Sequence, residues 1–114
     1  MMIKWLWLMR YPEGVPVEEG EKWYFEVHTQ EAKNFPDLKK YLTWKVLDVP
    51  ERPTNFVRVT ELWYDSLESW RHTYAVRHQY LKTPGPGGVL DPPAEVVCID
   101  EKPEYDLMRG IPKL

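Results

Sequence analysis

The stretch Phe56-Val57-Arg58-Val59-Thr60-Glu61-Leu62-Trp63-Tyr64 decides the fold, because a strand signal in it runs directly into a helix signal. Its β-branched and aromatic side chains are typical of a strand. Asp65 follows as the expected helix N-cap, and Glu68 three residues later completes a pattern that resembles a capping box. At helical spacing, one face of the following segment carries Leu67, Trp70, Tyr74, His78 and Leu81. The sequence therefore predicts a strand followed at once by an amphipathic helix.

Towards the N-terminus, the chain shows two further strands with a helix between the first and the second. Residues 3–9 are apolar on both alternating faces, as in a central strand covered on two sides. A helix is expected from Val17, after a proline that the first turn tolerates, to about Asn34. Residues 38–49 are predicted to form the next strand, and residues 50–53 a turn. One face of the helix carries Val17, Gly20, Trp23, Tyr24, Val27 and His28.

Towards the C-terminus, residues 94–100 form the last predicted strand. The turn-rich residues 82–93 precede it, and they serve either as a lid over a cleft or as a plain connection. The resulting order is β-α-β-β-α-β, which predicts an α+β, ferredoxin-like fold with an antiparallel sheet. We expect one domain over residues 1–102 and a tail over residues 103–114.

A two-layer fold of this kind leaves one face of its sheet without helices. Residues 3–9 and 96–99 are hydrophobic almost without interruption, which indicates that both faces of the sheet are covered. A second copy of the chain is the simplest cover. We therefore expect a homodimer in which the two sheets face each other.

The composition excludes several classes of protein. The 114 residues contain 15 Lys and Arg against 18 Asp and Glu, a net charge of −3 that does not suit a nucleic-acid binder. The lone cysteine, Cys98, cannot form an internal disulfide, which fits a cytoplasmic protein, and it is expected to be a small buried apolar residue. The apolar opening of the chain is too short for a membrane span.

Two segments carry a resemblance to a known family. Residues 23–28 with 35–41, and residues 59–68, are similar to the EthD-like proteins of the dimeric α+β barrel superfamily. The resemblance implies a small-molecule cleft between the sheet and the helices. Relatives in the superfamily include cofactor-free decarboxylases, lactone isomerases, polyketide cyclases, quinone-forming oxygenases and proteins with no assigned activity. The resemblance therefore implies a fold more closely than a reaction.

The candidate catalytic residues are His28, Tyr24 and Tyr41. His28 matches the histidine in the family's first helix, and a neutral imidazole at the margin of the apolar face can exchange a proton near neutral pH. The tyrosine hydroxyls are suited to hold a developing oxyanion. The alternative is structural: a histidine that closes the edge of the core, and tyrosines that pack their rings.

Other side chains are candidates for substrate contact. A carboxylate among apolar strand residues needs a partner or a raised pKa, and several rings are suited to line a cleft wall or simply to fill the core. These candidates are Trp44, Glu61, Trp63, Trp70, Tyr74 and His78. The histidines at positions 28, 72 and 78 do not have the spacing of a metal site, and we expect neither metal nor cofactor.

Two functions from different classes remain open. The first is a cofactor-independent enzyme of lyase, isomerase, cyclase or decarboxylase type, which moves a proton on a small ring-containing or carboxylated intermediate. The second is a non-catalytic ligand-binding or accessory protein for an oxygenase system. Haem binding through His28 or His78 is a weaker third possibility.

Overall fold

Four strands form one antiparallel sheet in the computed structural model, which describes residues 2–110 apart from the side chain of Cys98. The strands are β1 (Ile3–Met9), β2 (Lys40–Lys45), β3 (Arg58–Tyr64) and β4 (Ala94–Asp100). They lie in the order β2-β3-β1-β4, with every neighbouring pair antiparallel. This is the predicted ferredoxin-like arrangement, and β1 and β4 have the predicted bounds. The prediction that Cys98 is buried, and the last four residues of the predicted tail, lie outside what the structure describes.

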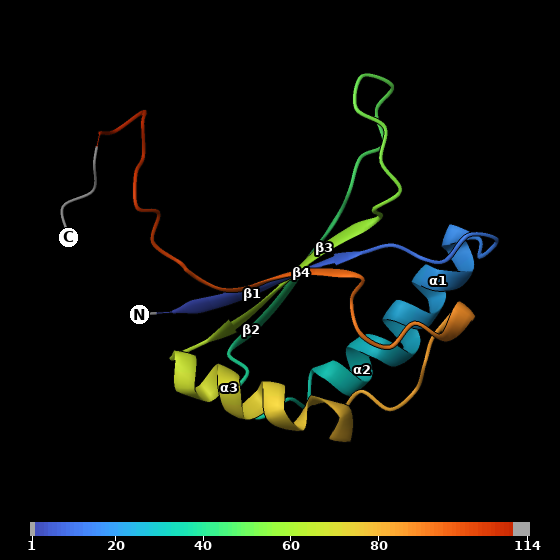
Figure 1. Ribbon diagram of the computed structural model, residues 1–114, viewed down its shortest axis with the longest axis horizontal. Helices are drawn as coiled ribbons and strands as arrows, with labels where there is room; N and C mark the ends of the chain where they lie inside the picture. The colour runs from blue at the N-terminus through green and yellow to red at the C-terminus, as the bar shows by residue number, and fades with distance from the viewer. Residues whose placement is uncertain (1, 111–114) are drawn as a thin grey trace.

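Both helical segments pack on one face of the sheet (Figure 1). The first consists of α1 (Val17–Trp23), the π-helical turn η1 (Tyr24–His28) and α2 (Thr29–Ala32). The second consists of α3 (Leu67–Val76) and the short 3₁₀ turn η2 (Arg77–Gln79), and a further 3₁₀ turn, η3 (Pro86–Gly88), lies in the loop before β4. Among residues 2–110, no helix has the length and apolar character needed to cross a membrane.

The two faces of the sheet differ in what they carry. Alternate residues of β1 and β3 point towards the helices and are buried; they are Ile3, Trp5, Trp7, Met9, Arg58, Thr60, Leu62 and Tyr64. The residues between them point to the opposite face, which no helix covers (Figure 1). Strand pairing places Leu42 beside Glu61, and Trp44 beside Val59, on that helix-free face. The core therefore lies between the helices and one side of the sheet.

A π-helical turn interrupts the first helix. The backbone N–H of Thr29 donates to the carbonyl of Tyr24, five residues earlier, so that this turn holds one residue more than an α-helical turn. Trp23, Tyr24 and His28 all lie on the buried side, as in the predicted helix. Periodicity at 3.6 residues per turn predicted a continuous helix, and it missed this turn.

The cap of α3 differs from the prediction by one residue. Ser66, not Asp65, is the N-cap: its hydroxyl accepts from the backbone N–H of Ser69 at 3.1 Å, and its own N–H donates to the Ser69 hydroxyl at 3.2 Å. Asp65 instead forms an exposed ion pair with Lys39 at 3.5 Å. Because β3 continues to Tyr64, Asp65 lies in the bend, and the helix begins after Ser66.

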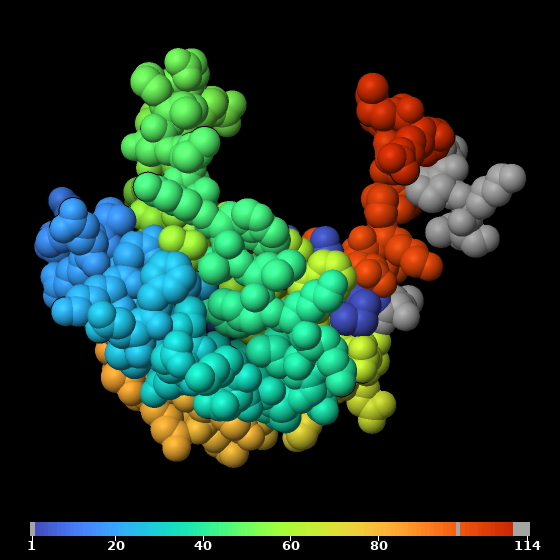
Figure 2. Space-filling model, turned by 180° about the vertical axis from the view of Figure 1, so that it is seen from behind, coloured from blue at the N-terminus to red at the C-terminus, as the bar shows by residue number. Residues whose placement is uncertain are grey.

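Two segments project away from the sheet on the side opposite the helices, and we call them the hairpin arm (residues 46–57) and the tail arm (residues 101–110) (Figures 1 and 2). The predicted bounds of two strands are wrong at the hairpin arm. β2 ends at Lys45 rather than at position 49, and β3 begins at Arg58 rather than at position 56. Each arm is closed near its tip by a single bridge, Val49 to Arg52 in one and Asp106 to Gly110 in the other.

Candidate functional site

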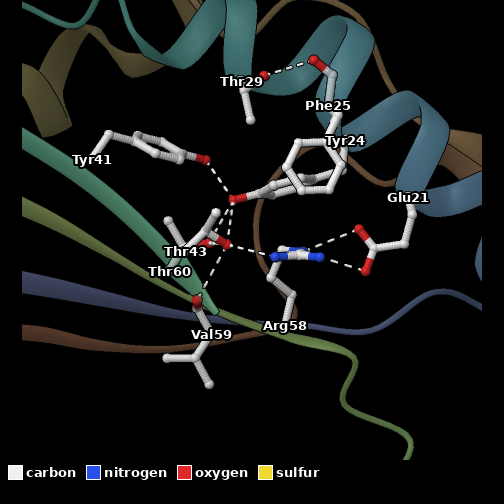
Figure 3. A network of polar contacts seen from close by, with 9 residues as sticks. All are labelled: Glu21, Tyr24, Phe25, Thr29, Tyr41, Thr43, Arg58, Val59 and Thr60. Carbon is white, nitrogen blue, oxygen red and sulfur yellow. Dashed lines mark hydrogen bonds and ion pairs between the residues drawn. The ribbon is translucent and has the colours of Figure 1, made fainter. Parts of the chain in front are cut away.

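A chain of hydroxyl groups crosses the interface between the first helix and the sheet (Figure 3). The Tyr24 hydroxyl lies 2.7 Å from the Tyr41 hydroxyl and 2.5 Å from Thr60 Oγ1. Thr60 Oγ1 donates to Thr43 Oγ1 at 3.1 Å, and Thr43 donates to the carbonyl of Val59 at 3.3 Å. Because the final acceptor is a carbonyl, the donors run in one direction, from Tyr41 through Tyr24 and Thr60 to Thr43.

Arg58 joins this hydroxyl chain to a carboxylate. Its Nε donates to both carboxylate oxygens of Glu21, at 3.1 and 3.3 Å, and its Nη1 donates to Thr43 Oγ1 at 3.2 Å. The guanidinium also lies over the Phe25 ring, 4.6 Å from its centre. Arg58 is buried, and a buried cation of this kind needs its carboxylate partner. The Glu21–Arg58 pair therefore ties α1 to β3 and holds the Glu21 carboxylate in place.

A groove with a volume of about 840 Å³ opens beside this network. Its walls come from the loop between β1 and α1 on one side and from the hairpin arm on the other. Tyr11 and Glu21 lie on the helix side of the groove, and Val46, Phe56 and Val57 lie on the hairpin side. A groove of this size is within the range of small-molecule sites. Glu21 lines the groove, and its ion pair with Arg58 connects the groove to the hydroxyl chain.

Tyr11 packs tightly against the first helix. A Cβ on Gly20 would lie 2.4 Å from the Tyr11 ring, so only glycine allows this approach. The Tyr11 hydroxyl is buried and has no hydrogen-bond partner among the described residues. Burial, and next the negative charge of Glu21, raise the pKa of Tyr11, so that the hydroxyl keeps its proton. In the same way burial, and next the neighbouring Tyr24, raise the pKa of Tyr41.

His28 lies in the core and not at the margin of a cleft, where its helix position had predicted it. The side chain is 1% exposed, and the centre of its ring lies 4.9 Å from that of Trp23, 5.3 Å from that of Trp7 and 5.4 Å from that of Tyr24. Burial lowers its pKa to about 4, against weaker opposing effects of Glu31 and Asp91. The imidazole is therefore neutral at physiological pH, and its Nε2 has no hydrogen-bond partner among the described residues.

The structure brings the three predicted catalytic residues together, but as a packed group. Tyr24 contacts His28 through its ring and Tyr41 through its hydroxyl. Tyr24 is fully buried, and the residues that line the groove do not include any of the three.

Three predicted substrate contacts, Trp44, Glu61 and Trp63, lie on the helix-free face and so cannot share a cleft with Tyr24. Glu61 forms an ion pair with Lys4 at 3.2 Å. The Trp63 ring receives Lys4 and Lys40, whose ammonium groups lie 5.0 and 4.6 Å from its centre. The reason for the separation from Tyr24 is that successive side chains of a strand point to opposite faces of the sheet, so that the odd-numbered residues of β3 face away from the helices.

The other three predicted contacts lie at the far end of the helix-covered side. Trp70 and Tyr74 stack on each other at 4.9 Å and pack against Trp5, as core residues do. His78 is exposed, and its Nε2 lies 2.9 Å from a carboxylate oxygen of Asp91. This contact ties down residues 82–93, which also pack on Trp23 through Gly85 and do not line the groove. The loop is thus a strap over the helices.

Sequence reasoning missed the residues that matter most here: Tyr11, Glu21, Thr43, Arg58 and Thr60. One signal was available for two of them. Arg58 and Thr60 share their parity with Leu62 and Tyr64, and a charged or polar residue on a buried strand face needs a partner. Among the side chains that the structure describes, no group of three or more His, Cys, Asp and Glu is placed to hold a metal ion.

Comparison with known proteins gives the fold. The structure is similar to the crystal structure of an ethyl tert-butyl ether D (EthD) family protein from Bacillus halodurans C-125, with a TM-score of 0.55, 24% identity, and coverage of 73% of this chain and 74% of that one. An EthD-like protein from Ralstonia eutropha JMP134 gives a TM-score of 0.52 at 22% identity, covering 70% and 75% of the two chains. The chain has the fold of EthD family proteins.

A third similar structure is a dimeric ferredoxin-like protein of unknown function from Thermobifida fusca YX. It gives a TM-score of 0.53 at 14% identity, covering 87% of this chain and 88% of that one. No family model and no curated protein matches the sequence. At these identities the comparisons confirm the EthD-like resemblance for the fold, and they carry no reaction with them.

Proposed function

We propose that the protein is a small cofactor-independent enzyme that binds a ring-containing molecule in the groove and moves a proton on it. The observation that supports this proposal is the meeting of the groove with the buried network at Glu21. The groove offers apolar walls, and the network holds one carboxylate in a fixed position. Acid–base chemistry at a held carboxylate needs no cofactor.

In the proposed step, the Glu21 carboxylate takes a proton from an O–H or C–H group of the ligand. The ligand becomes an anion, Glu21 becomes a neutral acid, and Arg58 stabilises the negative charge. When Glu21 returns the proton to a different ligand atom, the net reaction is an isomerisation. Thr43 is a positioning residue in this scheme, because it accepts from Arg58. Thr60, Tyr24 and Tyr41 are positioning residues as well, because their hydroxyls are linked to that of Thr43.

The second candidate is a non-catalytic ligand-binding or accessory protein, for example one that assists an oxygenase. The position of His28 favours it, because the residue that the sequence predicted as the proton shuttle is enclosed by rings and neutral. Both candidates use the same groove. They differ in whether a bound compound is converted.

The test is a thermal-shift screen of small ring compounds, followed by NMR analysis of each binder for conversion. Catalysis predicts that Glu21→Gln lowers turnover at least about a hundredfold, the usual contribution of a general base. The matched control is Glu18→Gln, which removes an exposed carboxylate from the same helix. Because Glu21→Gln also removes the charged partner of Arg58, the folding of this variant is checked by circular dichroism. Glu21→Asp serves as a second variant that keeps the negative charge. Binding without conversion of any compound selects the non-catalytic candidate.

The proposal includes a homodimer that buries the helix-free face of the sheet. Strand pairing places Leu42, Trp44, Val96 and Ile99 on this face, and Trp44 is 48% exposed in the single chain. Charge on this face should therefore separate the subunits: Trp44→Lys should elute as a monomer in light scattering with size-exclusion chromatography. The control is Leu67→Lys, which changes an exposed apolar residue at the start of α3. A dimeric Trp44→Lys would contradict the proposed interface.

Two further parts of the proposal rest on the sequence. A single cysteine and the balance of charges suit the cytoplasm. Residues 1–102 are proposed as the domain and residues 103–114 as its tail.

A further inference from the structure

We propose that the groove selects an uncharged ring compound that carries a hydroxyl group, and that it rejects carboxylates. This inference rests on the proposed function, because it names the class of ligand for the same groove. It narrows the sequence-based expectation, which allowed a carboxylated ligand as well.

The charges that line the groove are the first argument. Three carboxylates lie along it, from Glu13, Glu21 and Asp48, against one lysine, Lys45. Arg58 does not line the groove, and its guanidinium charge is already paired with the Glu21 carboxylate. A ligand carboxylate would therefore meet mostly negative charge, and would lose its hydration without gaining a buried cation of its own.

The hydrogen-bonding groups of two lining residues, Tyr11 and Glu21, are the second argument. The Tyr11 hydroxyl is buried without a partner and keeps its proton, so it is a donor in need of an acceptor. Glu21 can only accept. A ligand hydroxyl fits both groups, because it accepts from Tyr11 and donates to Glu21. A carboxylate accepts from Tyr11 but has no hydrogen to donate to Glu21 and is repelled by its negative charge. An ammonium group can only donate, so it leaves the Tyr11 hydroxyl without an acceptor.

The walls of the groove are the third argument. The lining also includes the apolar side chains of Val15, Val46, Leu47, Phe56 and Val57. Such walls favour a flat or branched apolar body. The volume of about 840 Å³ leaves room for one or two fused rings. Together, the three arguments describe a phenol-like or enol-like molecule.

The experiment measures the binding of four probes of equal ring size by calorimetry at pH 7: 2-naphthol, 2-naphthoate, naphthalen-2-ylmethylammonium and naphthalene. We expect 2-naphthol to bind about tenfold more tightly than either charged probe, the effect of about one hydrogen bond. Tyr11→Phe should weaken 2-naphthol binding by about tenfold, the loss of one of its two hydrogen bonds, and should leave naphthalene binding unchanged. Tyr105→Phe, which removes an exposed hydroxyl from the tail arm, should change neither. Tyr11→Phe keeps the ring that packs on Gly20, so the helix is retained.

The possible failures are distinguishable. If 2-naphthoate binds as tightly as 2-naphthol, or if Tyr11→Phe leaves 2-naphthol binding unchanged, the selection for a hydroxyl is wrong while the groove remains a ligand site. If none of the four probes binds at millimolar concentration, both this inference and the proposed groove site are overturned.

Discussion

The buried His28 makes the stability of the protein depend on pH in a way that the structure determines. Its pKa is about 4 in the folded protein, against 6.5 for an exposed histidine. Between these two values the unfolded chain binds a proton that the folded chain does not bind. His28 therefore does not affect the free energy of unfolding above about pH 6.5, and it lowers this free energy progressively as the pH falls from 6.5 towards 4. The loss from this residue is about 2 kcal/mol at pH 5 and approaches about 3 kcal/mol below pH 4.

Urea unfolding measures this loss directly, since the six tryptophans report the transition by fluorescence. We compare the wild type with His28→Leu, which cannot be protonated and has a similar volume, at pH 7.5 and pH 5. The variant should lose about 2 kcal/mol less than the wild type over this interval, whatever its stability at pH 7.5. His72→Gln is the matched control, because the ion pair of His72 with Asp37 is exposed and contributes little. Parallel losses in the wild type and His28→Leu would refute the argument.

The remaining predictions concern the hydroxyl chain, the floor of the groove and the cap of α3. Tyr24→Phe leaves the Tyr41 hydroxyl without its acceptor, so urea unfolding should show a loss of about 2–3 kcal/mol of stability. Tyr41→Phe leaves no donor unsatisfied, and its loss should be about 1 kcal/mol. A larger loss for Tyr41→Phe would mean that Tyr24 donates to Tyr41. Gly20→Ala forces the Tyr11 ring out of place, so this variant should have a lower melting temperature and weaker ligand binding in the groove. Unchanged binding would contradict the close packing of Tyr11 on Gly20. Ser66→Ala should cost about 1 kcal/mol, and Asp65→Ala less than about 0.5; equal losses would count against Ser66 as the cap.

The fold could be predicted because its signals are local. An uninterrupted apolar run gave β1, β4 stood out between prolines and charges, and the order of elements then left few topologies. The boundaries that were wrong depend on tertiary structure. The hairpin arm has the same β-branched and aromatic residues as a strand, but it extends beyond the ladder between β2 and β3. Sequence pattern alone does not show where a neighbouring strand ends.

The candidate site was only partly predictable, for two physical reasons. The alternation of side chains along a strand would have placed Trp44 and Glu61 on the opposite face from Tyr41 and Thr60, and this alternation can be read from the sequence. The full enclosure of His28 cannot be read in this way, because it depends on contact with Trp7 from another element and on the strap of residues 82–93, which brings Gly85 onto Trp23. Contacts between segments so distant in sequence leave no periodic signal.

The π-turn η1 separates two α-helical parts, α1 and α2, of the first helix. Gly20 and Glu21, before the turn, serve the groove, and Glu31, after it, holds the strap by accepting from Lys82 and Thr83. Deleting one residue within the turn would rotate one half against the other by about 100°, since each residue of an α-helix advances by that angle. The extra residue therefore sets the rotation of α1 about its axis relative to α2, and with it the side of α1 that Gly20 and Glu21 present to the groove.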